Sequence, residues 1–182
     1  MIRKKVLAIS GSTRQNSTNH SLIRAISYLS KNELDISVYN DISKLPQFNP
    51  DTDNENVVNE VTDFREQLDN SDGVIICTPE YAHGVPGTLK NAIDWTISSS
   101  QFPHKPTMLI TASTDGRYGH QALMETLKAI EAKNIDNLQM VIQFVKTKIF
   151  NDTITDEDTL KNVKILIANF IETINENKNE VE

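Results

Sequence analysis

Short apolar runs alternate with helical patterns along most of the chain. Five mainly apolar runs predict strands, and they cover residues 5–9, 35–40, 73–77, 107–112 and 138–144. Between and after them, apolar residues recur at helical spacing over residues 19–30, 57–68, 88–97, 123–130 and 160–174. Strands without a polar face, alternating with helices, predict a parallel sheet covered by helices on both sides.

The order of these elements suits a flavodoxin-like three-layer α/β sandwich. We expect one domain over residues 1–182, with a five-stranded parallel sheet in the order 2-1-3-4-5. In such sheets ligands bind outside the carboxyl ends of the strands, where the strand order reverses. The loops that follow Ile9, Cys77 and Ala112 are therefore the candidate binding loops.

Composition narrows the class of protein. The net charge of −7 argues against a general nucleic-acid surface or a surface for anionic membranes. The opening "MIRKKVLAISGS" has too short an apolar stretch for a membrane span or a signal peptide, so we expect a cytoplasmic protein.

A single cysteine, Cys77, cannot form an internal disulfide, and its apolar surroundings predict a small buried hydrophobe. The four histidines lack short metal-ligand spacing, and we predict no metal site.

The first candidate loop is "SGSTRQNSTNHSL", residues 10–22. It joins a strand to a helix, and the free N–H groups at a helix start favour an anion. Arg14 adds a planar cation suited to phosphate, and the side chains of Ser12, Ser17 and Asn19 could donate to its oxygens. The loop lacks the dinucleotide-binding glycine pattern and the Walker A lysine. The alternative is a polar turn with a helix cap.

The second candidate loop opens the stretch "TPEYAHGVPGTLKNAIDW", residues 78–95. Pro79 stiffens the exit from the strand, and Glu80 and Tyr81 lie at its carboxyl edge. Gly84 and Gly87 would let a flat ring lie close to the backbone. The alternative is a loop that only turns into the next helix.

The third candidate loop is "ASTDGRYGHQAL", residues 112–123. Gly116 and Gly119 place flexible backbone at the end of a strand and the start of a helix. Arg117 could meet a phosphate-bearing substrate or lie in solvent. His120, together with His83 of the second loop, is a candidate for contact with substrate.

Two motifs in these loops resemble the NADPH-dependent FMN reductase family of flavodoxin-like quinone, chromate and azo-dye reductases. They are Gly11–Ser17, of the form G-S-x-R-x-x-S, and "PEYAHGVPGTLKNAIDW", residues 79–95. The resemblance implies bound FMN, with Ser12, Arg14, Ser17 and Asn19 at the phosphate. It also implies that the isoalloxazine ring is lined by Pro79, Glu80, Tyr81 and the backbone near Ala82, with Ser113 and Gly116 from the third loop. Ala82 and Gly84 depart from the family's usual Asn and Ser, and His120 replaces a small residue.

The resemblance further implies a ping-pong reaction in which NADPH or NADH delivers a hydride to FMN. A quinone, azo compound, chromate or free flavin then takes the electrons, and no protein nucleophile is needed. It implies a homodimer or homotetramer, with Trp95 and Phe102 as candidate interface anchors. Two alternatives remain open: a flavodoxin-type electron carrier that does not oxidise NAD(P)H, and a flavin-free regulatory or scaffold domain.

Overall fold

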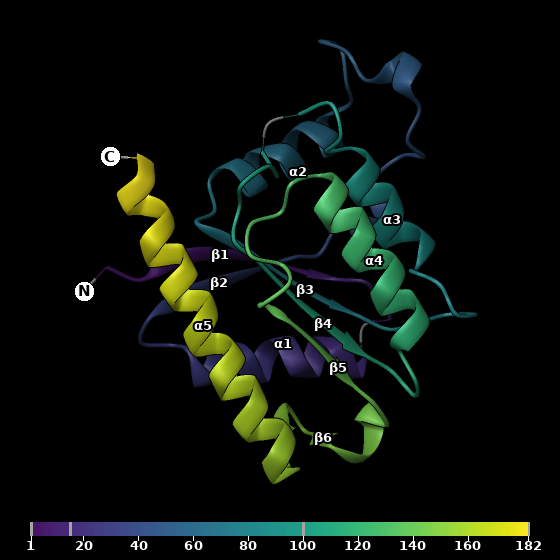
Figure 1. Ribbon diagram of the computed structural model, residues 1–182. Helices are drawn as coiled ribbons and strands as arrows, with labels where there is room; N and C mark the ends of the chain where they lie inside the picture. Colours follow the sequence, from purple (N-terminus) through teal and green to yellow (C-terminus); the bar gives the residue numbers. More distant parts are fainter. Residues whose placement is uncertain (1, 15, 100, 182) are drawn as a thin grey trace.

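Five parallel strands form the centre of the molecule (Figure 1). A computed structural model describes residues 2–14, 16–99 and 101–181. The sheet order is β2-β1-β3-β4-β5, which confirms the predicted flavodoxin-like order. The strands are β1 (Lys4–Ser10), β2 (Leu34–Tyr39), β3 (Gly73–Thr78), β4 (Thr107–Ala112) and β5 (Gln139–Ile142).

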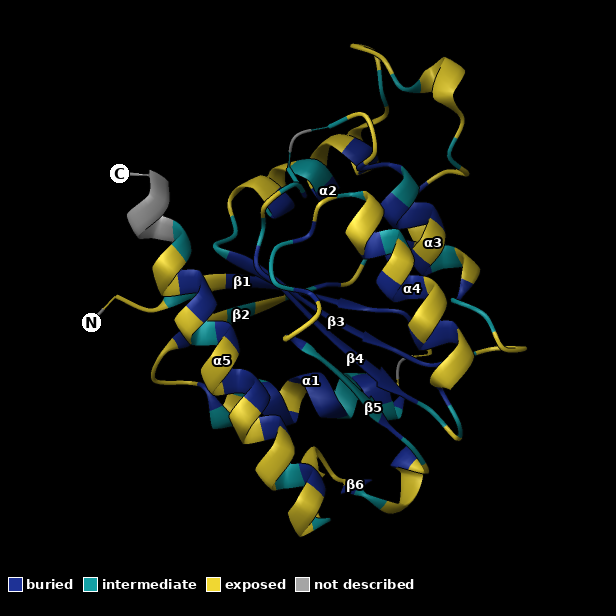
Figure 2. Ribbon diagram, viewed as in Figure 1, coloured by how far each residue is buried: buried dark blue, intermediate teal, exposed yellow. Residues whose placement is uncertain are grey.

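Helices cover both faces of this sheet (Figure 2). One core cluster joins the sheet to α1 (Thr18–Leu29) and α5 (Glu157–Val181). The other joins it to α2 (Asn59–Asp69), α3 (Gly87–Asp94) and α4 (Arg117–Ala129). No helix in the described residues is long and apolar enough to cross a lipid bilayer.

The central strands β3 and β4 are buried along their whole length. Because they are covered on both faces, they carry apolar residues on both sides, which explains their nearly continuous apolar runs. Cys77 lies in β3 and is completely buried, as predicted. Burial raises the pKa of its thiol, so the thiolate is suppressed.

Three expectations for the stretch after β3 are wrong. The helix ends at Asp94, so Ile97 is 60% exposed rather than inward. Trp95 and Phe102 lie in the core of a single chain and cannot anchor a partner. The indole Nε1 of Trp95 donates to the Pro46 carbonyl at 2.8 Å, so its polar atom is already satisfied within the chain.

The C-terminal third also differs from prediction. β5 ends at Ile142, and the chain continues into a one-turn helix, η3 (Val145–Thr147), and an antiparallel hairpin of β6 (Ile149–Phe150) and β7 (Thr153–Ile154). The hairpin packs against α1. The last helix, expected over residues 160–174, begins earlier and ends later, as α5 over Glu157–Val181.

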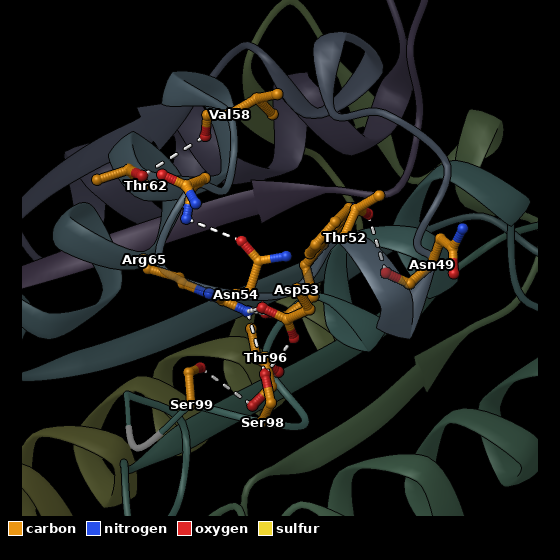
Figure 3. Close-up of polar contacts among 12 residues, drawn as sticks. Asn49, Thr52, Asp53, Asn54, Val58, Thr62, Arg65, Thr96, Ser98 and Ser99 are labelled. Atoms are coloured by element: carbon orange, nitrogen blue, oxygen red, sulfur yellow. Dashed lines mark hydrogen bonds and ion pairs between the residues drawn. The ribbon is translucent and has the colours of Figure 1, made fainter.

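A polar cluster fixes the long loop before α2 on the far side of the sheet from α1 (Figure 3). Arg65 of α2 donates to Asp53 at 2.8 Å and to the Trp95 carbonyl at 2.9 Å through Nε, and Ser98 donates to Asp53. Burial alone would raise the pKa of Asp53, but the bonds from Ser98 and Arg65 and the guanidinium charge lower it. This cluster ties the loop and the segment after α3 to α2.

The remaining one-turn helices, η1 (Ile42–Lys44) and η2 (Pro50–Thr52), lie in the same connection between β2 and α2.

Candidate functional site

A cavity of about 480 Å³ opens at the carboxyl ends of β1, β3 and β4, where the topology predicts a ligand. Its volume falls in the range of roughly 300–1,000 Å³ that small-molecule sites occupy. All three predicted loops contribute to it, and so does a fourth segment after β5. The lining residues are Ser12, Arg14, Ser17, Thr18, Asn19, Pro79, Glu80, Tyr81, Ala112, Ser113, Thr114, Phe144, Val145, Lys146 and Thr147.

The first loop forms a cradle at the start of α1. Ser17 is the N-cap, and its Oγ accepts from the His20 backbone N–H at 3.2 Å. Ser12 is buried, and its Oγ accepts from the Arg14 N–H at 3.4 Å. Because both hydroxyls use an acceptor position in these bonds, each still has its own proton to donate to an anion.

The charges at the cavity are mainly positive. The side chains of Arg14 and Lys146 both line it, and neither has a hydrogen bond or ion pair within the described part of the chain. Glu80 is the one carboxylate in the lining, and backbone N–H groups already bind it. In a protein of net charge −7, this local balance favours an anionic ligand.

Asn19 has a role that its sequence position did not reveal. Its Nδ2 donates to the Ala112 carbonyl at 3.2 Å, which joins the first turn of α1 to the end of β4. Its Oδ1 is buried, and no described residue donates to it. A carbonyl oxygen accepts but cannot donate, so Asn19 suits a ligand hydroxyl better than a phosphate oxygen. This revises the phosphate contact expected for Asn19.

The second loop makes a tight turn from Tyr81 to Gly84. The two residues exchange backbone hydrogen bonds of 3.1 and 2.9 Å, and the residues between them, Ala82 and His83, have φ angles of 49° and 58°. Left-handed backbone is uncommon for residues other than glycine and asparagine, and such strain tends to gather at functional sites. The turn leaves Tyr81 in the cavity lining and half exposed, whereas Ala82 does not line the cavity.

Glu80 joins the second loop to the third. Only 6% of its side chain is exposed. Its two carboxylate oxygens accept from the backbone N–H groups of Gly116, at 3.4 Å, and Gly119, at 2.6 Å, at the start of α4. The Glu80 N–H donates in turn to the Ser113 hydroxyl at 3.3 Å. The sequence suggested a ring contact for Glu80, but its carboxylate holds two loops together.

Glycine is needed at both positions of this joint. Gly116 has a φ of 92°, which L side chains rarely adopt, and it does not line the cavity. A Cβ on Gly119 would lie 3.0 Å from the Gly84 carbonyl oxygen and 3.1 Å from the Glu80 Cγ. The third loop therefore approaches the second as closely as its backbone allows.

The candidate substrate residues lie in three different environments. His83 is exposed beside the cavity, with Nδ1 3.6 Å from a Glu80 oxygen and its ring edge-on to Tyr118 at 4.6 Å. Arg117 lies outside the lining in solvent and pairs with Asp115 at 2.7 Å, which raises the Arg117 pKa.

His120 does not fit a contact with substrate. It is buried and outside the cavity lining, with Nδ1 2.9 Å from the Thr111 hydroxyl and Nε2 2.7 Å from the Gln139 side-chain oxygen. Burial lowers its pKa and favours the neutral ring. We therefore remove His120 from the candidate substrate residues and assign it to the packing of α4 on β4 and β5.

Residues 144–147 of the lining were missed from the sequence. Phe144 appeared to be the end of a strand, but it has a φ of 52° and is 63% exposed. The two lysines in "VKTK" interrupt the apolar pattern directly after the strand. That interruption, at the carboxyl end of a strand next to β4, is the signal that could have identified a fourth loop.

FMN fits the residues present. The cradle of hydroxyls, helix start and cations suits its phosphate, and the buried Oδ1 of Asn19 suits a hydroxyl of its ribityl chain. Pro79, Tyr81 and Ser113 border the remaining space, where the flat ring would lie. In the described part of the chain, no group of three or more His, Cys, Asp or Glu residues could hold a metal ion.

Comparisons with known proteins agree with this site. The sequence model of the family described as NADPH-dependent FMN reductase matches residues 4–147. An NADH-dependent flavin reductase subunit 2 from Lactobacillus johnsonii is 29% identical, over 93% of this chain and 97% of its own. A 2-hydroxy-1,4-benzoquinone reductase from a Burkholderia species is 30% identical, over 86% and 88%.

Among solved structures, a flavoenzyme NAD(P)H:(acceptor) oxidoreductase from Paracoccus denitrificans shares the fold. It superposes with a TM-score of 0.78 at 24% identity, over 96% of this chain and 98% of its own. The family match covers well over half of the chain and includes all four segments of the cavity lining. The chain therefore belongs to the NADPH-dependent FMN reductase family, and it is an FMN-dependent oxidoreductase that uses NAD(P)H.

Proposed function

We propose that residues 1–182 act as one FMN-binding domain and reduce a small acceptor by a ping-pong mechanism. The acceptor is a quinone, azo compound, chromate or free flavin. The cavity supports this proposal most directly, because the cationic cradle of the first loop and the space bordered by Pro79, Tyr81 and Ser113 belong to one cavity. Bound FMN would supply the redox chemistry, taking a hydride from NADPH or NADH and passing the electrons on.

The phosphate end depends on the first loop. Ser12 and Ser17 would donate their hydroxyl protons to phosphate oxygens, and the start of α1 would add backbone N–H groups and its dipole. Arg14 would pair with the phosphate, because no carboxylate in the described residues competes for its guanidinium. Asn19 would accept from a ribityl hydroxyl through Oδ1.

The ring end depends on the joint between the second and third loops. Glu80 holds the N–H groups of Gly116 and Gly119, so the second and third loops are fixed to each other before the cofactor binds. Tyr81 and Pro79 would border the ring. A fixed frame of this kind lowers the ordering cost of binding.

Both substrates would reach the ring from the side of the exposed turn. His83 lies there with most of its side chain in solvent, and we propose it as a contact for the acceptor or for the nicotinamide. NADPH and the acceptor would use the same opening in turn, which is the physical basis of the ping-pong scheme. Arg117 could reach a nucleotide phosphate only by leaving Asp115.

We further propose a cytoplasmic homodimer or homotetramer. Tyr118 and Ile97, which are exposed in the single chain, replace Trp95 and Phe102 as candidate contacts. The Lactobacillus johnsonii relative is named as a subunit, so an assembly with a second, different chain is the alternative. Light scattering at micromolar concentration tests this: a single chain in solution would contradict the homo-oligomer.

The first test is an absorbance spectrum of the purified protein, recorded without oxygen before and after NADPH or NADH is added. We expect a flavin band that bleaches with the nucleotide and returns when a quinone is added. Initial rates at several quinone concentrations should give parallel double-reciprocal lines, and intersecting lines would contradict the ping-pong scheme. A flavin band that neither nucleotide bleaches would favour an electron carrier. A protein that does not bind added FMN would overturn the proposal.

A further inference from the structure

The segment after β5 forms a fourth wall of the cavity, and it is firmly held. The Phe144 N–H donates to the Thr114 carbonyl at 3.2 Å, and the Val145 N–H donates to the Ser113 carbonyl at 3.2 Å. The Gln143 side chain donates to Asp115 at 2.9 Å. These bonds fix residues 144–147 against the third loop.

After this wall the chain forms a hairpin that contacts α1, the helix whose start forms part of the phosphate cradle. The hairpin of β6 and β7 packs against α1, below which it lies in Figure 1. The Nε of Arg24 in α1 donates to Asp152 at the tip of the hairpin at 2.8 Å. Residues 144–147 are thus held to the third loop by backbone bonds, and the hairpin that follows them is held to α1.

Lys146 is the charged residue of this wall. It lines the cavity, and its ammonium group has no hydrogen bond or ion pair among the described residues. Lys148, two residues later, differs: it is outside the lining, and its charge helps to lower the pKa of Asp156. The same short segment therefore carries one lysine whose charge acts on Asp156 and one whose ammonium group has no partner among the described residues.

We propose that Lys146, in the segment after β5, binds the phosphate of FMN together with Arg14. This inference rests on the proposed function, in which the cavity holds FMN. A phosphate monoester carries a charge of about −1.5 to −2 at pH 7, which one guanidinium does not neutralise. A flexible ammonium is a suitable second partner, since it acts as a point charge and needs no fixed fork geometry. Glu80, the one carboxylate of the lining, is bound to Gly116 and Gly119 and does not compete for it.

The test compares FMN with riboflavin, which has the same ring and ribityl chain but no phosphate. The full chain, freed of flavin, is titrated with each while the quenching of flavin fluorescence is followed. We expect Lys146→Gln to weaken FMN binding about tenfold and to leave riboflavin binding unchanged. Lys146→Arg should retain most of the FMN affinity. Lys148→Gln is the matched control, because it removes the same charge from the same segment outside the cavity, and it should change neither affinity.

The dependence of FMN binding on salt gives a second measure. The affinity of the wild type should fall more steeply with ionic strength than that of Lys146→Gln, because the variant has lost one charge pair. The unfolding temperature of the flavin-free protein should be equal in the two, since no described residue pairs with the ammonium group of Lys146.

Four results would overturn the role of Lys146: FMN affinity equal to wild type, equal loss for FMN and riboflavin, equal loss in Lys148→Gln, or a change only in the KM for NADPH. The last would assign the lysine to the nucleotide. A wild type that binds neither flavin would instead overturn the proposed function, so the two failures can be told apart.

Discussion

The two ends of the cavity, which we propose for the ring and for the phosphate of FMN, are built in opposite ways. At the ring end, the polar groups satisfy one another: Glu80 binds the N–H groups of Gly116 and Gly119, and Ser113 binds the backbone of Glu80. At the phosphate end, polar groups lack partners within the described residues, namely the side-chain cations of Arg14 and Lys146 and the buried Oδ1 of Asn19.

This difference separates what stabilises the fold from what binds the ligand. Paired groups at the ring end contribute to stability whether or not a ligand is present. Unpaired groups at the phosphate end contribute only when a ligand supplies the missing partner, and a buried unpaired oxygen is a cost until then. Substitutions at the two ends should therefore appear in different measurements.

The largest effect is expected at Glu80. Glu80→Ala removes a nearly buried carboxylate that accepts two backbone N–H bonds, and it leaves both donors without a partner. We expect the free energy of unfolding of the flavin-free protein to fall by about 3 kcal/mol, which is the sum typical of two bonds to a charged group. Urea unfolding measures this directly.

A control at the same position separates charge from shape. Glu80→Gln keeps the volume and one acceptor oxygen, so it should lose about half as much stability as the alanine variant. If the flavin-free Glu80→Ala protein unfolds at the wild-type urea concentration, the joint between the loops does not stabilise the fold, and the contrast between the two ends is wrong.

Asn19→Ala should show the reverse behaviour and a smaller effect. It loses the bond from Nδ2 to the Ala112 carbonyl, but it also removes the buried oxygen that lacks a donor, so flavin-free stability should change by less than about 1 kcal/mol. FMN and riboflavin should both bind about fivefold more weakly, because a ribityl hydroxyl common to both loses its acceptor. Titration of both flavins checks this, and a loss confined to FMN would return Asn19 to the phosphate.

The architecture and three of the four binding segments could be predicted from the sequence, because each depends on a local pattern. Apolar runs at β3 and β4 and the polar loops after them identify the sheet and its ligand-binding edge. The segment at Phe144 could not be predicted this way, since an apolar residue after a strand looks like more strand until its φ of 52° is known. Roles that depend on contacts between distant parts of the chain could not be predicted either. Nothing near Trp95 in the sequence shows that the Pro46 carbonyl accepts from its indole N–H, and nothing near Glu80 shows that α4 binds its carboxylate.

The smallest effect is expected at His120, which joins α4 to β4 and β5. Its two bonds suit the neutral ring, with a proton on Nε2 toward Gln139 and Nδ1 accepting from Thr111. Burial lowers its pKa in the folded state, so between that pKa and the unfolded value near 6.5 the unfolded chain binds more protons.

The stability that neutral His120 provides is therefore complete above about pH 6.5 and is lost as the pH falls through the lowered folded pKa, by at most about 1.4 kcal/mol per pH unit. His120→Gln should abolish this part of the pH dependence. Urea unfolding of the flavin-free wild type and variant measures this contribution at pH 5.5, 6.5 and 7.5, three points chosen around the ordinary histidine pKa of about 6.5. The difference between the two proteins isolates the contribution of His120, because the other three histidines are present in both. Parallel stability profiles would show that His120 is free to ionise in the fold, and the packing of α4 on β4 and β5 would then tolerate a charge.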